Sequence, residues 1–471
     1  MALIDMSKST IIKKISYSVF ANVISLLVSI FMVIIVPKFL SLEDYGLWQL
    51  FLFYYSYIGF FHFGWEDGIY LRYAGNSFET LDSKLFAGQL YGIIVLQLLV
   101  SAVVLTGSMW VINDPIKQRV LWCIVFIIPF VNFNNACNQI MQFTDCIKRY
   151  ATLVLLERTL LLSAIVLCFA AGFRTFSHLY FAKVFSIVSV SLVGAYWCKS
   201  LLKLHFYPLK ESLKEASINL SVGSKLMFAN IASMLIIGIV RYGISIGWDI
   251  TTFGKISLTL NVSNFLMVFI SAVSVVLFPL LKHMEWGQLS NLYIRIRNCL
   301  SILILGAMIF YYPMKSLLSW WLPKYADSLI YMAVLFPVCL FECKVTLLVN
   351  TYLKSMRQEA LILKINGIAV ISSMMLTVVS VALFHNLTMA VFSIVFLYAG
   401  RCFLAEYHLQ KLLSLNLRKD MMQEMLLVLV FIATGWKLNS WMTMIIYALC
   451  YGCYFILNRS KVHDVIMLIK K

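Results

Sequence analysis

The sequence predicts an all-α, polytopic membrane protein with about fourteen transmembrane helices. Of its 471 residues, 62% are hydrophobic and 13% are charged, and the mean hydropathy is +0.88. Soluble proteins average roughly 45–50% apolar and 25% charged residues. Apolar runs of about 20 residues, the length at which a helix crosses a bilayer, follow one another almost to the end of the chain. Composition and run length therefore agree on the class.

The apolar runs give the expected position of each span to within a few residues. In chain order they are 16–36, 46–63, 85–107, 119–141, 152–172, 177–197, 224–246, 255–280, 298–318, 328–350, 361–384, 387–408, 421–436 and 441–457. The thirteenth run is short, which leaves open whether it is a true span. The loops between the runs are too short to fold as separate domains.

The charges of the connecting segments predict the orientation. With fourteen spans and a cytoplasmic N-terminus, 25 basic residues of loops and termini fall on the cytoplasmic side and 7 on the other side. Cytoplasmic loops of membrane proteins carry this excess of Lys and Arg. Both termini are thus expected in the cytoplasm. The net charge of +17 is explained by loops beside anionic headgroups, so nucleic acid is not an expected partner.

The chain contains a faint internal repeat. A shift of 208 residues, without a gap, aligns Ser16–Phe61 with Ser224–Phe269 and gives 10 identities in 46 positions. The two aligned segments share two long apolar runs with a glycine between them. Because both copies start on the same side of the membrane, the sequence predicts two halves built as parallel repeats.

Six basic residues lie within or at the edge of spans: Arg158, Lys183, Arg241, Lys255, Lys344 and Arg401. A charge at the bilayer centre costs about 2.5–3.5 kcal/mol, so it normally faces protein or a wet cavity. Arg241 is the most informative, because its counterpart in the repeat is Val33. It either snorkels to the interface or faces a cavity as a site for an anionic ligand. Lys344 and Glu342 are two residues apart and do not share a helix face, so each has another partner or faces a cavity.

The fourth span carries a polar face. Asn135, Asn138, Gln139 and Gln142 follow the spacing i, i+3, i+4, i+7, and Asn132 and Asn134 precede them. Amides within spans can join helices by hydrogen bonds. Their number favours the wall of a hydrated cavity, in which amides would bind sugar hydroxyls or headgroups.

No catalytic or metal-binding pattern is found. The seven histidines are dispersed without an HExxH motif, and the chain has no GxxxxGK[ST] phosphate-binding loop. The sequence therefore predicts neither an enzyme, nor a cofactor, nor a metal site.

Two segments after the first span and one in the second half resemble a known family. They are Val36–Trp48 (VPKFLSLEDYGLW), Gly64–Tyr73 (GWEDGIYLRY) and the stretch from Phe253-Gly254 to Pro279. They resemble the polysaccharide (O-antigen) lipid flippases of the multidrug/oligosaccharidyl-lipid/polysaccharide exporter superfamily. The number and size of the spans extend this resemblance over the whole chain.

The resemblance implies two pseudo-symmetric six-helix bundles around a central cavity, with an extra C-terminal helix pair. The corresponding division is residues 1–205, a cytoplasmic linker at 206–222, residues 223–410, and the pair with its tail at 411–471. It implies transfer of an undecaprenyl-diphosphate-linked oligosaccharide across the bacterial inner membrane by alternating access. It also implies a coupling ion, proton or sodium, and as further partners a polysaccharide polymerase and a chain-length regulator.

The resemblance also suggests roles for residues. Cavity cations would hold the diphosphate, with Arg241 as first choice, followed by Arg158, Lys344 and Arg401, and the amides of the fourth span would contact sugar. Gating or ion coupling would involve Glu43, Asp44 and Glu342. Many relatives have an acidic residue directly before the basic one in helix seven, whereas this chain has Val240, which leaves the coupling chemistry open.

Three other functions were weighed. A drug or cation antiporter of the same fold usually needs a membrane carboxylate, and the first helix has no charge between Lys14 and Lys38. A membrane-embedded polysaccharide polymerase or acyltransferase typically needs a sizeable outer loop or a catalytic His/Arg cluster. A membrane scaffold is the least specific reading. The sequence favours the flippase, and it identifies neither the sugar nor the driving ion.

Overall fold

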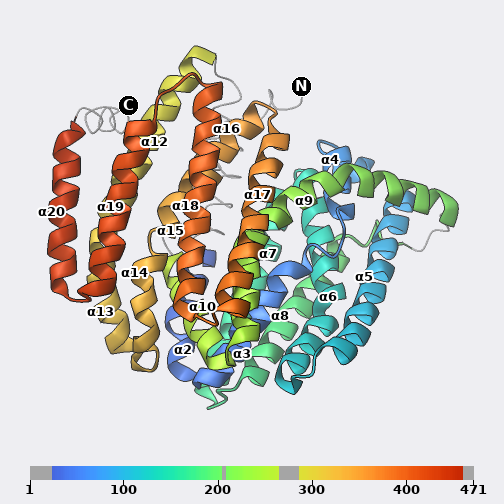
Figure 1. Ribbon diagram of the computed structural model, residues 1–471. Helices are drawn as coiled ribbons and strands as arrows, with labels where there is room; N and C mark the ends of the chain where they lie inside the picture. Colours follow the sequence, from blue (N-terminus) through green and yellow to red (C-terminus); the bar gives the residue numbers. More distant parts are fainter. Residues whose placement is uncertain (1–23, 204–207, 265–285, 460–471) are drawn as a thin grey trace. The chain divides into compact units, whose positions relative to one another are not determined.

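A computed structural model describes residues 24–203, 208–264 and 286–459, and in these ranges the chain is helical, without β-strands (Figure 1). The expected all-α, polytopic class is confirmed. Some expectations fall outside the described residues: the start of the first span, most of the eighth span with Pro279, and the basic residues of both termini.

Eight helices in the described ranges are long and apolar enough to cross a membrane. They are Ser83–Val111, Pro115–Phe143, Ile147–Ala170, Phe176–Trp197, Leu209–Gly247, Leu289–Trp321, Glu359–Leu383 and Leu387–Leu412. A ninth is formed if Pro323–Leu335 and Val338–Ser355, bent by 46° at their junction, make one span. Ile24–Phe39 and Trp441–Leu457 are shorter apolar helices. The observed positions match the expected spans to within a few residues at most boundaries.

The chain divides into two compact units, Met1–Ile231 and Ala232–Lys471, here called unit 1 and unit 2. The described helices of unit 1 are α2 (Val36–Phe39), α3 (Leu42–Ile58), α4 (Trp65–Tyr73), η1 (Phe78–Thr80), α5 (Ser83–Val111), α6 (Pro115–Phe143), α7 (Ile147–Ala170) and α8 (Phe176–Trp197), followed by the first part of α9. Helix α6 packs against α3, α4, α5, α7 and α8. It is therefore the central helix of unit 1, and it carries the amides of the fourth expected span.

Unit 2 begins within α9 (Leu209–Gly247) and continues to the C-terminus. Its other described helices are α10 (Ile250–Ser263), α12 (Trp286–Ala307), η2 (Met308–Phe310), α13 (Tyr311–Trp321), η3 (Pro323–Tyr331), α14 (Met332–Leu335), α15 (Val338–Cys343), η4 (Lys344–Val349), α16 (Asn350–Ser355), α17 (Glu359–Thr377), η5 (Val378–Leu383), α18 (Leu387–Leu412), α19 (Arg418–Lys437) and α20 (Trp441–Leu457). Helix α18 packs against α14, α15 and α17, while α19 packs against α14 and α20 (Figure 1). The C-terminal helix pair thus packs against α12, α13 and α14 of unit 2.

Two segments of unit 2, η4 and η5, are π-helical. Insertions of this type are rare and frequently occur at functional sites. Lys344, one of the predicted site residues, is the first residue of η4.

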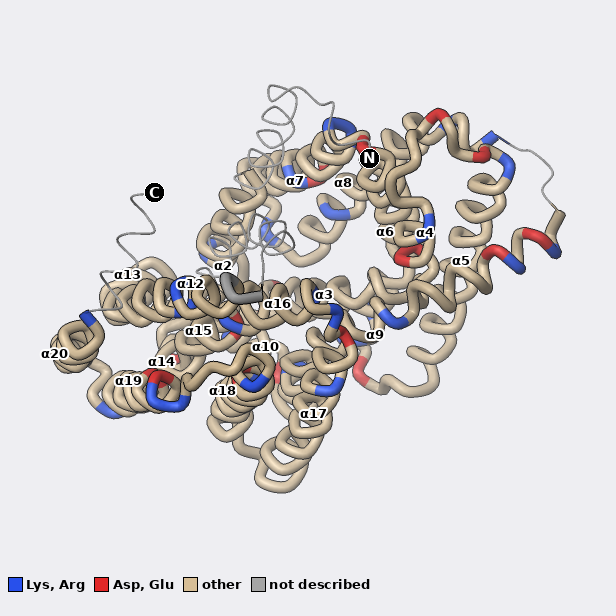
Figure 2. The backbone as a smooth tube through the Cα atoms, turned by 90° about the horizontal axis from the view of Figure 1, so that it is seen from above, with Lys and Arg blue, Asp and Glu red and all other residues tan. Residues whose placement is uncertain are grey.

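Helix α9 differs from the expected linker. The sequence indicated a linker at 206–222, whereas α9 is a continuous helix of 39 residues from Leu209, and the division between the units falls inside it. The first part of α9 is rich in Leu, Lys, Glu and Ala, which all favour helix. Figure 2 shows basic and acidic residues alternating along this part. One of them is held in place, because Glu215 accepts hydrogen bonds from Arg72 of α4, with Nη2 and Oε1 3.3 Å apart.

Helix α4 and the first part of α9 touch through their backbones. Gly64, the N-cap of α4, has φ +92°, a conformation that favours glycine. A Cβ atom built at Gly223 would lie 1.9 Å from the carbonyl oxygen of Gly64, and one built at Gly68 would lie 1.9 Å from that of Asn219. Only residues without a side chain allow this approach.

The structure supports the internal repeat. The second helix of each repeated hairpin starts at the same position of the alignment, because the N-caps Ser41 and Asp249 are 208 residues apart. The glycines of the two copies, Gly46 and Gly254, are both buried in these helices.

Candidate functional site

Arg241 lies on α9 in unit 2 and points toward α10. Its Nη2 donates a hydrogen bond to Ser257 Oγ at 3.1 Å, and its guanidinium carbon lies 5.6 Å from the centre of the Phe253 ring. Because Phe253 and Ser257 are one turn apart, α10 presents an aromatic face and a hydroxyl together. Arg241 itself is half-buried. The structure thus places a partly accessible guanidinium between the two helices of the second repeat copy.

Arg401 on α18 is buried and bonded by three polar side chains. It is 1% exposed. It donates to Glu342 Oε2 at 2.9 Å, to Asn366 Oδ1 at 3.0 Å and to Ser233 Oγ at 2.9 Å. Glu342, predicted as a gating or coupling residue, is therefore the ion-pair partner of Arg401. These bonds connect α15, α17 and α9 to α18.

Lys344 belongs to a buried cluster of four charges, here called the ion cluster: Arg297, Lys344, Glu406 and Glu424. Each of these side chains is no more than 5% exposed. Arg297 bonds Glu406 through Nε at 2.6 Å and Glu424 through Nη2 at 2.8 Å. Lys344 Nζ lies 3.5 Å from Glu406 Oε2 and also bonds Glu424. The four buried charges balance, which limits their desolvation penalty. Asp420, which is partly exposed, lies at the edge of the cluster with its Oδ2 3.9 Å from Arg297 Nη1.

The ion cluster bears on two expectations, the position of Arg297 and the partners of Lys344. Arg297 lies outside the expected ninth span, 298–318, and so belongs to the basic residues expected in cytoplasmic loops. That expectation was wrong, because Arg297 is buried in α12, which begins before the expected span. Lys344 was expected to pair elsewhere than with Glu342, and its partners are on α18 and α19. The signal for them was two glutamates, Glu406 and Glu424, inside apolar runs that cannot leave a carboxylate unpaired.

The remaining predicted cation, Arg158, lies exposed on α7. Its neighbour Glu157 instead accepts a hydrogen bond from Lys183 Nζ of α8 at 2.8 Å. Lys183 Nζ also lies 4.4 Å from the centre of the Tyr55 ring. The charge of Lys183 is therefore neutralised within unit 1, and that of Arg158 is left at the surface of its helix.

The first hairpin contains two acidic residues, Glu43 and Asp44, and Asp44 caps the N-terminus of α8. Its Oδ1 accepts from the backbone N–H of Phe176, the first residue of α8, at 2.8 Å. Its Oδ2 accepts from Ser41 Oγ at 2.6 Å. Glu43 is exposed. Asp44 thus secures the start of α8, where a carboxylate is favoured by the helix dipole.

The amides of α6 divide into two groups. Asn132 joins helices, since its Nδ2 donates to Gln97 Oε1 at 2.6 Å and to the Ile58 carbonyl at 3.2 Å. In contrast, the side-chain oxygens of Asn134, Asn138 and Gln139 have no hydrogen-bond partner among the described residues. The other two predicted amides contrast in exposure: Asn135 is half-buried and Gln142 is exposed. The interhelical interpretation thus holds for Asn132, and the cavity-wall interpretation of the other amides stays a prediction.

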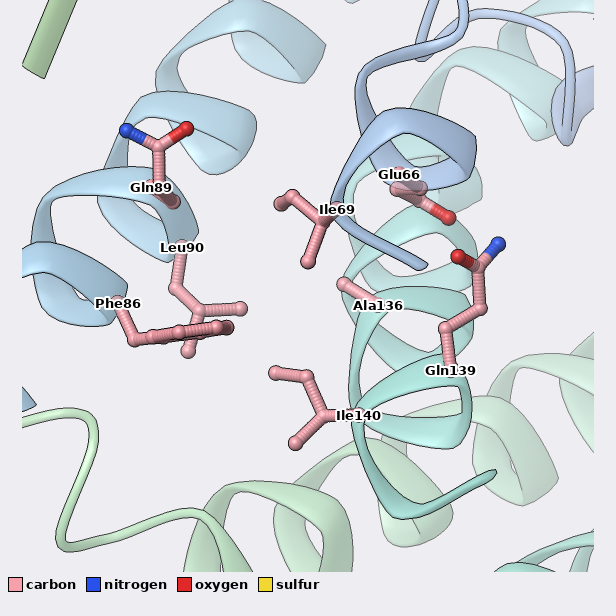
Figure 3. A pocket seen from close by; sticks show the side chains of 8 residues that line it. All are labelled: Glu66, Ile69, Phe86, Gln89, Leu90, Ala136, Gln139 and Ile140. Carbon is pink, nitrogen blue, oxygen red and sulfur yellow. The ribbon is translucent and has the colours of Figure 1, made fainter. Parts of the chain in front are cut away.

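A small cavity lies in unit 1 between α4, α5 and α6 (Figure 3). Its volume is about 10 Å³, close to the minimum that holds one water molecule. The polar side chains lining it are Glu66, Gln89 and Gln139. Glu66 is 1% exposed, and neither of its carboxyl oxygens has a hydrogen-bond partner in the described ranges. The sequence-based site did not include Glu66, although its position directly after an apolar run was visible.

A larger cavity of about 530 Å³ lies between α5, α6 and α8 of the same unit. Its lining is apolar except for two serines, Ser101 and Ser191. Their hydroxyls donate to the carbonyls of Val125 and Phe130 at 3.2 and 3.1 Å. With its serines already bonded, this cavity suits hydrocarbon rather than sugar.

The fold is that of known membrane transporters. The solved structure of lipid II flippase MurJ in an inward closed conformation matches with a TM-score of 0.69 at 12% sequence identity, over 96% of this chain and 100% of that one. The inward-facing conformation of a multidrug resistance MATE family transporter of the MOP superfamily matches with a TM-score of 0.63 at 12% identity, over 88% and 96%. The sequence matches no protein-family model and no curated protein. At this identity the likeness establishes the fold alone.

Proposed function

We propose that the protein is a flippase that transfers a polyprenyl-diphosphate-linked oligosaccharide, such as an O-antigen unit, across the bacterial inner membrane by alternating access. The observation that supports this most is the match over nearly the whole chain to a lipid II flippase. The match to a MATE transporter covers a smaller share of the chain. By their descriptions, both of these solved structures are transporters or flippases.

In this proposal Arg241 contacts the diphosphate. It is half-buried, so it can be reached, and its position beside Ser257 and Phe253 holds the guanidinium in place. A guanidinium binds phosphate oxygens through paired N–H donors, which fits a diphosphate group. Arg158 is exposed on unit 1 and is the second choice. Lys344 and Arg401 are engaged by buried carboxylates, and we assign them to the stability of unit 2.

A drug antiporter of the same fold is the competing function. Such a protein needs a carboxylate that is available to a cationic substrate. In the described membrane-spanning helices, Glu157 is paired with Lys183, Glu342 with Arg401, and Glu406 with Arg297. Glu66, which makes no ion pair in the described ranges, lies on α4 outside these helices and is buried. This pairing favours an anionic substrate over a cationic one.

Arg241→Ala tests the proposed contact in cells. We expect the variant to insert normally, to abolish surface polysaccharide, and to leave the lipid-linked unit on the inner leaflet. Arg241→Lys keeps the charge and should retain part of the activity, since lysine binds phosphate as a point charge. The matched control is Lys255→Ala on α10, whose ion pair with the exposed Asp327 is loose at 3.8 Å. Wild-type export by Arg241→Ala would remove this residue from the site.

A further inference from the structure

We propose that Glu66 is a proton-binding site in unit 1, and that the bound proton is shared with the side-chain oxygen of Gln139. The inference deepens the proposed function, on which it rests for its role, by naming the proton as the coupling ion. The site uses α4 and α6 of one unit and is separate from the cations discussed above.

The geometry provides an acceptor for the proton. In Figure 3 the carboxyl group of Glu66 on α4 points toward the amide end of Gln139 on α6. Both lie at the small cavity, and the oxygens of both lack a donor among the described residues. Two oxygens facing each other without a hydrogen are repulsive, whereas a protonated Glu66 carboxyl can donate its single O–H to the Gln139 oxygen.

Gln89, the third polar side chain of the cavity, does not donate a hydrogen bond to Glu66 or Gln139. Gln89 Oε1 accepts from Trp65 Nε1 at 2.7 Å and from Asn219 Nδ2 at 3.0 Å. Gln89 Nε2 donates to the Ser212 carbonyl at 3.3 Å. The second N–H of Gln89 donates to neither Glu66 nor Gln139, because the oxygens of both lack a hydrogen-bond partner among the described residues. Gln139 is therefore the polar group that Glu66 faces.

The lack of a basic partner favours the neutral form of Glu66. Among the described residues it makes no ion pair, and the nearest cation of α4, Arg72, is bonded to Glu215 and Asn219 of α9. Burial raises the pKa of the Glu66 carboxyl well above its ordinary value, and the neighbouring Asp67 raises it further.

The other titratable groups around the cavity are few. Asp67 has a pKa raised to about 6 by burial, and its Oδ2 lies 3.9 Å from His62 Nε2. Helix α6 contributes only uncharged side chains to the lining of the cavity, among them Gln139. Helix α5 contributes the neutral Gln89 to the cavity. A carboxylate at Glu66 would thus gain no compensating charge from α4, α5 or α6.

A proton fits this site better than a metal ion. In the described part of the chain no group of three or more His, Cys, Asp or Glu side chains is arranged to hold a metal. One carboxyl group, one amide oxygen and room for about one water molecule are too few ligands for a cation that requires six or more oxygens. Proton binding needs only the carboxylate and a nearby acceptor.

The proton gives α4 two states. With Glu66 protonated, α4 can remain closed against α6 and against the glycine contact with α9. When the proton leaves, the carboxylate must reach water, because an unpaired buried charge is not tolerated. Release of the proton therefore favours separation of α4 from α6, at the end of unit 1 that the loop charges predict to be cytoplasmic. Such a coupled change is what a proton-driven flippase requires.

Infrared difference spectroscopy of the full-length protein in nanodiscs tests proton binding without any substrate. We expect the wild type to show the carbonyl band of a protonated carboxylic acid at neutral pH, which disappears at alkaline pH, and Glu66→Gln to lack it. The matched variant Asp67→Asn should keep the band. A band unaffected by Glu66→Gln, or an ionised Glu66 at neutral pH, would overturn the proposal.

The pH dependence of thermal unfolding gives a second readout. A carboxyl with a raised pKa in the folded state binds more protons there than in the unfolded state, so stability is highest below the ordinary glutamate pKa and falls as pH rises toward the raised value. Glu66→Gln should flatten this fall, since glutamine imitates the protonated acid. A slope identical to that of the wild type would contradict a buried, titrating Glu66.

Transport then tests the coupling. In proteoliposomes that contain a polyprenyl-diphosphate-linked saccharide, a pH gradient should accelerate flipping by the wild type and have no effect on Glu66→Gln. A response to a sodium gradient in place of the pH gradient would overturn the coupling role. If neither protein flips the saccharide but the infrared band is present, the proposed substrate fails and the proton site stands.

Discussion

At the scale of single residues, the buried charges of unit 2 are partners of one another. Lys344 and Arg401 were candidates for a ligand site because a lone charge in a span is costly. The structure shows the usual solution to that cost, a carboxylate from another helix. Sequence reasoning located the charges correctly, but it could not pair them because their partners are 59 or more residues away.

The ion cluster predicts a large effect of one substitution. Glu424→Ala should lower the free energy of unfolding by about 3–5 kcal/mol, because Arg297 and Lys344 would be left with Glu406 as their only buried carboxylate, and Asp420 is partly exposed and 3.9 Å from Arg297. Thermal unfolding of the purified protein in detergent measures it. The control is Glu359→Gln, at an exposed position in the first turn of α17. Equal unfolding temperatures for the two variants would show that the ion cluster contributes no stability.

The candidate site could be predicted only in part, for a physical reason. Helical spacing placed the amides of α6 on one face, and several of them have side-chain oxygens without a hydrogen-bond partner among the described residues. Spacing could not show that Asn132 is used for a bond to Gln97, because that depends on the packing of α5 against α6. For the same reason, Glu66 was not predicted. It is of interest because its carboxyl oxygens are buried without a hydrogen-bond partner among the described residues, and only the packing of the helices shows this.

At the scale of helices, apolar runs predicted where helices cross the membrane but not where they end. The expected span at 441–457 has the bounds of α20, whereas α9 extends some four turns before the apolar run that predicted it. Hydropathy detects only the apolar, membrane-embedded part of a helix. The polar extension of α9 is instead stabilised by Arg72 and by the backbone contact with α4.

The backbone contact between α4 and α9 predicts that a single methyl group will separate them. In Gly223→Ala the new Cβ would lie 1.9 Å from the Gly64 carbonyl oxygen, so one of the helices must move. We expect lower stability and faster proteolysis of the first part of α9. Gly107→Ala on α5 is the matched control, because nothing lies within 4 Å of its Cβ position and alanine favours helix. If the two variants are cleaved at the same rate, the close contact does not hold α9.

At the scale of the whole molecule, the two units and the repeated hairpin describe a chain built from related halves. The repeat was faint because ten identities in 46 positions are few in so apolar a sequence. The structure strengthens it, since α3 and α10 begin at equivalent positions. The halves differ in sequence where function is expected. In the alignment of the repeat, Val33 corresponds to Arg241, and the pair Glu43-Asp44 corresponds to Thr251-Thr252. The different roles of the two hairpins, an acidic loop in the first and a membrane cation in the second, stay a prediction from the sequence. The substrate could not be predicted in this way, because its binding depends on side chains from many helices.

Deletion of the protein separates the flippase from its competitors. We expect loss of the surface polymer with undiminished synthesis of the lipid-linked unit, because synthesis occurs before transfer and polymerisation after it. A polymerase mutant would instead display single units on the outer surface, and an antiporter mutant would keep its polymer and become sensitive to cationic drugs. Leaflet-specific labelling of the lipid-linked unit distinguishes these outcomes. Complementation with wild type and with Lys255→Ala should restore the polymer, and complementation with Arg241→Ala should not.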